Sequence, residues 1–228
     1  MDNEIKGSLK KRTAEHYDKI SKYYDRGNIP YDIFNIQLFK FLSSTEILEY
    51  LESGDVALDI ACGTGDISFG LAKRFQRVYG IDISKGMLNR AKLKMETAKA
   101  ENRQIGIIYG DGEHLPFKDE SFDAVTCILA IEHFPDTERA ISEMKRVLKD
   151  RGILVFNLLE IRDGILKKIF EGALQLLRRQ FFTEVNSEKL SRFLGNAERY
   201  ERSDLLGPFF RYIFKNTVFV YRKWLKNC

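Results

Sequence analysis

Between residues 53 and 160, five short apolar runs alternate with longer amphipathic stretches, and this rhythm constrains the fold more than any other feature. Each run suits one buried strand, and the stretches between the runs have the spacing of helices. Strands that alternate with helices form right-handed β-α-β crossovers, which build a mostly parallel, doubly wound sheet. The predicted strands are 56–60, 78–83, 105–109, 124–129 and 153–158, and the predicted helices are 66–75, 85–100 and 136–149.

The regions before residue 53 and after residue 160 depart from this alternation of strands and helices. Residues 4–51 have the spacing of two helical segments that break at a turn containing glycine and proline, 27–30. The pattern therefore predicts an α/β fold with a mostly parallel, seven-stranded, Rossmann-like sheet, N-terminal helices and a helical insertion before the last two strands. After residue 160, the predicted elements are a long helix over 163–181, a shorter helix over 187–195, and two strands near 198–206 and 216–223.

Length and composition exclude several classes of protein. A chain of 228 residues with 44% hydrophobic and 31% charged residues can bury a sizeable core, which excludes disorder. No run approaches the ~18 apolar residues of a membrane-spanning helix, and the acidic N-terminus does not resemble a signal peptide. We expect a single cytoplasmic domain, made of a helical cap (1–52), a binding core (53–160), and substrate-side helices with terminal strands (161–228).

Metals and nucleic acids are not expected partners. The three cysteines lack the paired spacing of a zinc site or a disulfide framework. The net charge of +4 is mild, and no nucleic-acid-binding module is visible.

The stretch 56–66 carries the most chemical information. An apolar strand containing Asp59 leads directly into a tight turn with Gly63 and Gly65, and glycines there allow backbone to approach a ligand and to adopt a positive φ. Asp59 and Asp66 would repel a pyrophosphate, because no lysine or arginine in the turn offsets them. The third glycine of the NAD fingerprint is also absent. The turn therefore favours a neutral or cationic ligand, and an NAD-dependent oxidoreductase is the less favoured alternative.

Two further acids lie at the ends of the next two predicted strands. Asp82 is placed where a carboxylate can accept from two ribose hydroxyls, and Asp111 is placed to accept from an exocyclic amine. Together with Asp59, they are about one β-α unit apart, so parallel strands would bring all three to the same edge of the sheet. Each acid alone could instead cap a helix or shape a turn. Three at successive strand ends, beside glycine turns, predict a nucleoside site.

These motifs resemble those of class I S-adenosylmethionine-dependent methyltransferases. Their pattern is most similar to that of the branch that methylates ubiquinone and menaquinone precursors at carbon. Ala61 stands where many members have the first glycine of the turn, and that branch also tolerates alanine there. The resemblance covers residues 50–160, and the N-terminal 17–25 stretch is similar to the branch's opening helix. The motifs that carry it are 59–65, 80–84, 110–117 continuing to 121–123, and 147–152.

The resemblance implies S-adenosyl-L-methionine as the cofactor and S-adenosyl-L-homocysteine as the product. It implies that Asp59 supports the turn and the cationic amino group, that Asp82 holds the ribose, and that Asp111 accepts from the adenine amine. Met87 could cover the adenine or belong to the core. The implied cofactor-binding residues are Tyr24, Asp59, Ala61, Gly63, Thr64, Gly65, Asp82, Ile83, Met87, Asp111, Gly112, Ile128 and Leu129.

The acceptor side offers fewer signals. Glu132 and His133 follow the fourth predicted strand, and either could remove a proton from a methyl acceptor. His133 could also simply pack at the strand end. A base is optional, because a sulfonium is already a good leaving group and alignment is the main requirement.

The 161–182 stretch combines an apolar face with five basic and two acidic residues. This pattern suits a helix over an apolar acceptor pocket, a helix on an anionic membrane surface, or an ordinary packed helix. We expect a small-molecule or lipid- and prenyl-type acceptor, with peripheral contact at the inner membrane surface as one option. The alternatives are a methyltransferase for a small polar metabolite and a cofactor-binding protein without turnover. No closing motif of the quinone branch matches after residue 160.

Overall fold

Seven strands form a single sheet in the order β3-β2-β1-β4-β5-β7-β6. The structure, a computed structural model, describes residues 3–25, 48–97, 104–161, 185–202 and 214–224. The strands are β1 (Gly54–Ile60), β2 (Phe75–Asp82), β3 (Gln104–Tyr109), β4 (Phe122–Cys127), β5 (Leu148–Ile161), β6 (Glu198–Glu201) and β7 (Phe214–Arg222).

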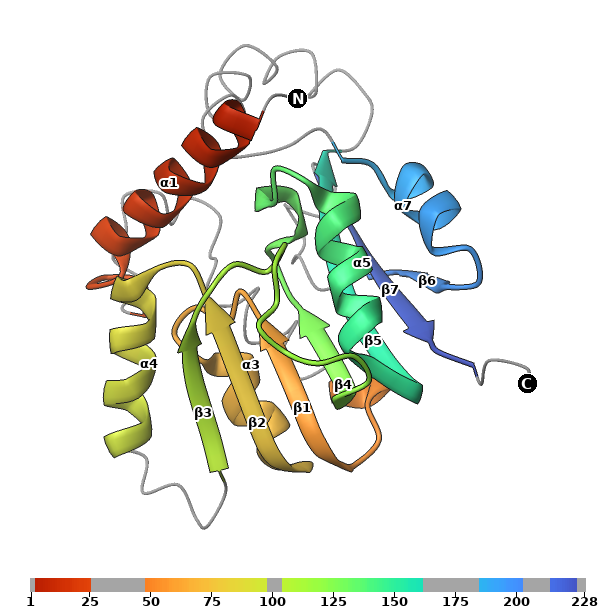
Figure 1. Ribbon diagram of the computed structural model, residues 1–228, viewed down its shortest axis with the longest axis horizontal. Helices are drawn as coiled ribbons and strands as arrows, with labels where there is room; N and C mark the ends of the chain where they lie inside the picture. Colours follow the sequence, from red (N-terminus) through yellow and green to blue (C-terminus); the bar gives the residue numbers. More distant parts are fainter. Residues whose placement is uncertain (1–2, 26–47, 98–103, 162–184, 203–213, 225–228) are drawn as a thin grey trace.

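The first five strands are parallel, and β7 runs antiparallel between β5 and β6. The chain proceeds outward from β1 to β2 and β3 and then returns to the other side of β1 to form β4. This reversal creates a switch point at the carboxyl ends of β1 and β4, where open α/β sheets bind their ligands. The predicted mostly parallel, seven-stranded sheet is confirmed (Figure 1).

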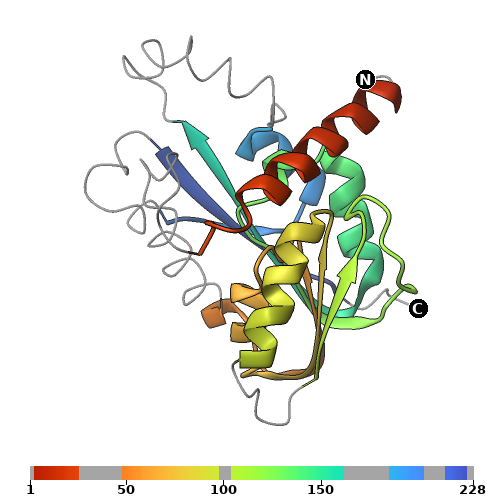
Figure 2. The same ribbon diagram turned by 90° about the vertical axis from the view of Figure 1, so that its left-hand side faces the viewer.

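Helices cover both faces of the sheet (Figure 2). One face packs against α5 (Thr137–Val147) and α7 (Ser187–Leu194), and the other packs against α3 (Asp66–Leu71). Apolar residues recur along α5 at helical spacing, and the Asp136 carboxylate caps its first turn by accepting from the Arg139 amide. The remaining helical elements are α4 (Lys85–Thr97) and two short 3-10 turns, η2 (Leu48–Tyr50) and η3 (Ile131–His133).

The N-terminal helix α1 (Asn3–Ile20) lies beyond the carboxyl ends of β2 and β3 and packs against the start of α4 (Figure 1). Gly86 at the start of α4 permits this close approach, because a Cβ there would lie 2.9 Å from the Asp18 Cα of α1. The helix therefore covers the edge of the sheet where the site was predicted.

Several element boundaries differ from the prediction. The predicted helix 66–75 ends at Leu71, and β2 already begins at Phe75. Likewise β5 begins at Leu148, inside the predicted helix 136–149. In both places strand pairing continues the sheet, with Gly54 opposite Phe75 and Phe122 opposite Leu148, and this tertiary pairing overrides the local helical spacing. Residues 26–47, which include the predicted turn at 27–30 and most of the second N-terminal segment, lie outside the described residues, as does the predicted helix 163–181.

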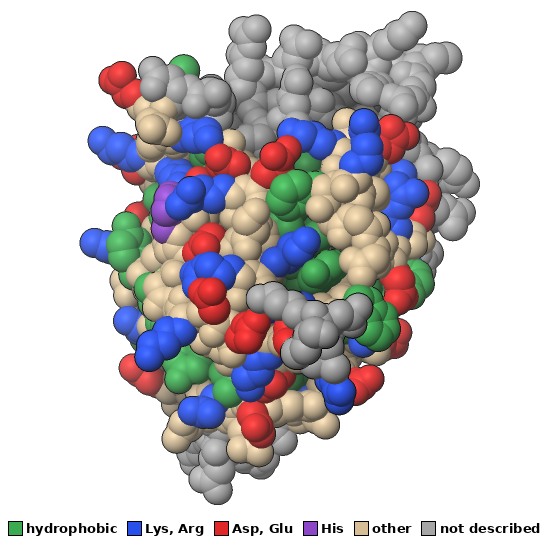
Figure 3. Space-filling view, turned by 45° about the vertical axis from the view of Figure 1, so that its right-hand side comes forward, with side chains coloured by type: hydrophobic (Ala, Val, Ile, Leu, Met, Phe, Trp, Pro, Cys, Tyr) green, Lys and Arg blue, Asp and Glu red, His purple; other side chains and the backbone are tan. Residues whose placement is uncertain are grey.

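Basic and acidic side chains are interspersed over the face of the molecule that Figure 3 shows. Among the described residues, no helix has the length and apolar content needed to cross a membrane.

Candidate functional site

A cavity opens at the carboxyl ends of the central strands, with α1 forming one of its walls. Four of the predicted residues, Asp59, Thr64, Gly65 and Glu132, do not line it. Asp59 and Thr64 border a smaller adjoining cavity, and Gly65 and Glu132 border neither of the two. The predicted residues that the main cavity does bring together are Tyr24, Ala61, Gly63, Asp82, Ile83, Met87, Asp111, Gly112, Ile128, Leu129 and His133.

The turn after β1 is held to the end of β2 by Asp82. One carboxylate oxygen, Oδ2, accepts from the Gly63 amide at 2.8 Å, and Oδ1 accepts from the Ser84 amide at the same distance. Burial raises the pKa of Asp82, against the lowering effect of these amides. A carboxylate has about four lone-pair sites, so capacity remains for hydroxyl groups of a ligand.

Backbone conformation shapes the same turn. Gly63 and Gly65 have φ values of 55° and 89°, and Ala61 has φ 54° although it carries a side chain. A Cβ built on Gly63 meets nothing within 4 Å, so this glycine faces open space. The turn therefore presents bare backbone to the cavity.

Asp59 lies beneath the turn and is only 1% exposed. It accepts from the Ser68 hydroxyl at 2.6 Å and from the Thr126 hydroxyl at 2.9 Å, which links β1 to α3 and β4. Burial raises the pKa of Asp59 to about 7 despite these hydrogen bonds. These hydrogen bonds join Asp59 to the scaffold around the turn.

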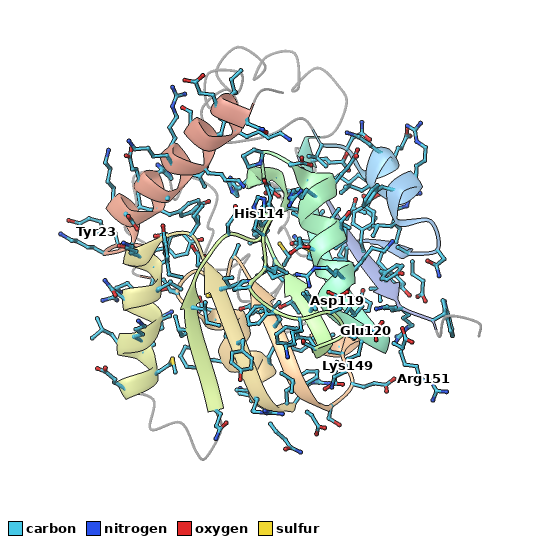
Figure 4. The ribbon with its side chains drawn as sticks, viewed as in Figure 1. Tyr23, His114, Asp119, Glu120, Lys149 and Arg151 are labelled. Atoms are coloured by element: carbon cyan, nitrogen blue, oxygen red, sulfur yellow. The ribbon has the colours of Figure 1, made fainter. Side chains whose placement is uncertain are left out.

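Asp111 also lines the cavity and contacts His114, which is labelled in Figure 4. Its Oδ2 lies 2.6 Å from Lys10 Nζ and 2.9 Å from His114 Nδ1, and its Oδ1 accepts from the Glu113 amide at 2.9 Å. Burial would raise the pKa of Asp111, but the hydrogen bonds from these three neighbours hold it below its usual value. The oxygen and nitrogen ligands of Asp111, Glu113 and His114 could hold a metal ion, but Lys10 already places a cation against both acids.

A tyrosine and a histidine meet across the cavity. Tyr17 of α1 places its hydroxyl 3.0 Å from His133 Nε2, and the two rings form an edge-to-face pair. Burial raises the pKa of Tyr17 well above 10, so its hydroxyl stays protonated. Glu132 is 9% exposed, is not among the residues that line the cavity, and has a pKa raised to about 7 by burial.

Polar contacts also join the C-terminal half of α1 and the turn after it to the core. Asp18 Oδ1 accepts from the Ser84 hydroxyl and the Gly86 amide, which attaches α1 to the first turn of α4. Asp25 Oδ1 accepts from the Thr64 hydroxyl at 2.7 Å and pairs with Lys94 at 2.9 Å. Sequence reasoning missed all of these contacts, together with Lys10 and Tyr17. No local pattern marked them, because their partners lie more than 35 residues away in the chain.

The sequence is similar to known methyltransferases over its central part. Residues 58–156 match the family model described as "Methyltransferase domain". The chain is 37% identical to the demethylmenaquinone methyltransferase of Staphylococcus aureus over 150 residues, which is 64% of this chain and 59% of that protein. It is 34% identical to the enzyme of the same name from Lactobacillus johnsonii over 144 residues, which is 62% of this chain and 55% of that protein. The matches thus span less than two thirds of these relatives.

Solved structures share the fold at low sequence identity. Phosphoethanolamine N-methyltransferase 2 of Haemonchus contortus, in complex with S-adenosyl-L-methionine, has a TM-score of 0.67 at 19% identity and covers 90% of this chain and 60% of its own. The [4+2]-cyclase SpnF has a TM-score of 0.72 at 17% identity and covers 93% of this chain and 96% of its own. One neighbour is named a methyltransferase and the other a cyclase, so these likenesses establish the fold and not the reaction.

Proposed function

We propose that this chain, whose residues 58–156 form a class I methyltransferase domain, transfers a methyl group from S-adenosyl-L-methionine to a reduced quinone-type acceptor. One observation carries the proposal: the glycine turn, two strand-end acids and His133 border a single cavity at the switch point of the sheet. The relatives that match at 34–37% identity support the quinone class of acceptor.

The residues around the cavity fit the cofactor. Gly63 faces open space with a positive φ, so a side chain there would enter the volume that a ligand needs. Asp82 keeps lone pairs for the two ribose hydroxyls, and Asp111 offers an acceptor for the adenine amine. Met87, which is 1% exposed, lines the same cavity as these two acids and would contact the adenine face. When bound, the cofactor supplies a methyl group on a cationic sulfonium.

The acidic surroundings suit that charge. Asp59, Asp66 and Asp82 lie on or beside the turn after β1, and Lys94 contacts Asp66 at 2.8 Å. Asp59 and Asp82 instead accept hydrogen bonds from hydroxyl and amide groups of the scaffold. A cationic ligand would therefore be favoured there over an anionic one. This charge distribution also disfavours a dinucleotide, as the sequence predicted.

The chemistry of the acceptor indicates which oxidation state reacts. An oxidised quinone ring is poor in electrons and cannot attack a methyl group. The reduced ring carries hydroxyls, and loss of one hydroxyl proton makes the neighbouring ring carbon nucleophilic. The residue proposed to take this proton is His133, at Nε2.

The contact between Tyr17 and His133 bears on this task. The Tyr17 hydroxyl keeps its proton, and in the tautomer in which this hydroxyl donates to Nε2, the imidazole carries its own proton on Nδ1. A neutral imidazole can accept the hydroxyl proton of an acceptor that replaces Tyr17 at Nε2. Glu132 does not line the cavity, so its predicted part in proton removal is the weaker of the two proposals.

Acceptor identity can be tested with the purified chain. Titration calorimetry with S-adenosyl-L-homocysteine should show binding, and radiolabelled S-adenosyl-L-methionine should label a reduced prenylated naphthoquinol and leave its oxidised form unlabelled. His133→Asn should slow labelling by at least tenfold while it leaves binding of S-adenosyl-L-homocysteine unchanged. Absence of binding of S-adenosyl-L-homocysteine would overturn the proposed cofactor. Binding without labelling of any reduced quinone, together with labelling of polar amines such as phosphoethanolamine, would overturn the acceptor class.

A further inference from the structure

Lys10 is bound by two carboxylates at the edge of the cavity. Its Nζ lies 2.6 Å from Asp111 Oδ2 and 2.6 Å from Glu113 Oε2. The Glu113 side chain is only 2% exposed, and its other oxygen accepts from the Asp136 amide at 2.8 Å. Both carboxylates are thus anchored to the core, and they fix the position of the ammonium group.

The ammonium group retains one donor. It carries three N–H bonds, and the two carboxylates account for two of them. Although burial lowers it, the hydrogen bonds and charges of Asp111 and Glu113 raise the pKa of Lys10 overall, so the group keeps all three protons at neutral pH. Lys10 lines the cavity beside Asp111 and Gly112, so the third N–H is available to a ligand in that corner.

A donor beside an acceptor is complementary to one edge of adenine. The exocyclic amine of adenine is a donor, and the ring nitrogens that flank it, N1 and N7, are acceptors. Asp111 can receive the amine, and Lys10 can donate to a flanking ring nitrogen. A 6-oxo purine would instead place a carbonyl oxygen against the Asp111 carboxylate, which is unfavourable because both groups are acceptors.

We propose that Lys10 is a specificity residue of the cofactor site, which donates to a ring nitrogen of adenine while Asp111 accepts from the adjacent amine. This inference rests on the proposed function, because it concerns the same cofactor. It assigns to α1 a direct part in reading the base, in addition to forming a wall of the cavity.

Lys6 provides a matched control. It lies one helical turn before Lys10 on α1 and also makes an ion pair with the core, with its Nζ 2.6 Å from Asp136 Oδ2. Its side chain is 25% exposed, close to the 18% of Lys10, but it does not line the cavity. Loss of Lys6 therefore removes an ion pair of α1 without removing a donor from the site.

The test is titration calorimetry with S-adenosyl-L-homocysteine and with its 1-deaza, 7-deaza and 6-oxo analogues. For Lys10→Met we expect at least a tenfold weaker affinity for S-adenosyl-L-homocysteine, and for Lys6→Met a change within twofold. With one of the two deaza analogues, Lys10→Met and the parent protein should bind equally, because the contact is already missing. The parent should reject the 6-oxo analogue. Lys10→Arg, which keeps donors, should retain most of the affinity and shows that loss of folding is not the cause.

Other outcomes separate the two proposals. If the parent binds S-adenosyl-L-homocysteine and Lys10→Met binds it equally well, the assignment of Lys10 is wrong and the proposed function stands. If Lys10→Met weakens the binding of both deaza analogues as much as that of S-adenosyl-L-homocysteine, Lys10 acts only through α1 or Asp111, and the assignment is again wrong. If the parent binds none of these compounds, the proposed cofactor itself is wrong.

Discussion

Glu132 should make the stability of the folded protein depend on pH. Its side chain is 9% exposed within η3, and burial raises its pKa from 4.5 to about 7. The unfolded chain releases this proton near pH 4.5, whereas the folded protein holds it until about pH 7. Between these values the folded state binds more protons than the unfolded state, so its free energy of unfolding falls as pH rises.

The size of this effect follows from the shift. One pKa unit corresponds to about 1.4 kcal/mol, so the ionised carboxylate costs the folded state about 3 kcal/mol above pH 7. Below pH 4.5 both states are protonated and the cost is absent. Glu132→Gln removes the titration, and its stability relative to the parent should therefore be about 3 kcal/mol more favourable at pH 8 than at pH 4.

Urea unfolding followed by far-ultraviolet circular dichroism, repeated from pH 4 to pH 8, measures this difference. Comparison between the two pH values cancels any constant cost of burying an amide in place of a carboxyl group. Glu52→Gln is the control for the substitution itself, because Glu52 is exposed just before β1. Parallel pH profiles for Glu132→Gln and the parent protein would refute the reasoning.

Two further substitutions test the turn after β1. Asp82→Asn should weaken the binding of S-adenosyl-L-homocysteine at least tenfold in calorimetry, because the side-chain amide oxygen cannot accept from both the Gly63 and Ser84 amides and also from ribose. Asp55→Asn, at an exposed position, is the control, and equal affinities of Asp82→Asn and the parent would contradict the ribose assignment. Ala61→Gly should raise the free energy of unfolding in urea by about 0.5–1 kcal/mol, because φ 54° is strained for a residue with a Cβ; a loss of stability would contradict that strain.

The sheet and its switch point could be predicted because their signals are local. Each strand from β1 to β5 is an apolar run, and the acids at 59, 82 and 111 lie at or just beyond the carboxyl ends of β1, β2 and β3. The parallel arrangement then requires these strand ends to share one edge. The structure places Asp82 and Asp111 on the same cavity, as this reasoning predicted, while Asp59 turns toward Ser68 and Thr126 beneath the turn.

Boundaries were less predictable where two signals overlap. The end of α3 and the start of β2 both contain apolar residues at spacings that suit either element. Phe75 became strand because it pairs with Gly54, and Leu148 became strand because it pairs with Phe122. Neither pairing is visible in local periodicity, because each depends on a strand more than 20 residues away.

The N-terminal helix was predicted, but the contacts of α1 were not, because polar side chains make them. Thr13 is its single buried residue, and the contacts that hold it are those of Lys6, Lys10, Tyr17 and Asp18 with groups that follow β2, β3 and β4. Helical spacing predicts where a helix lies and which apolar face it buries, but it does not predict the distant partners of polar side chains, and this helix buries little else. The same property has a functional consequence. Because little apolar surface depends on α1, substitutions at its contact residues remove parts of the cavity wall without disturbing the two apolar clusters of the sheet. Substitutions at these contact residues should therefore mainly weaken ligand binding, whereas substitutions in the apolar clusters should mainly lower the free energy of unfolding.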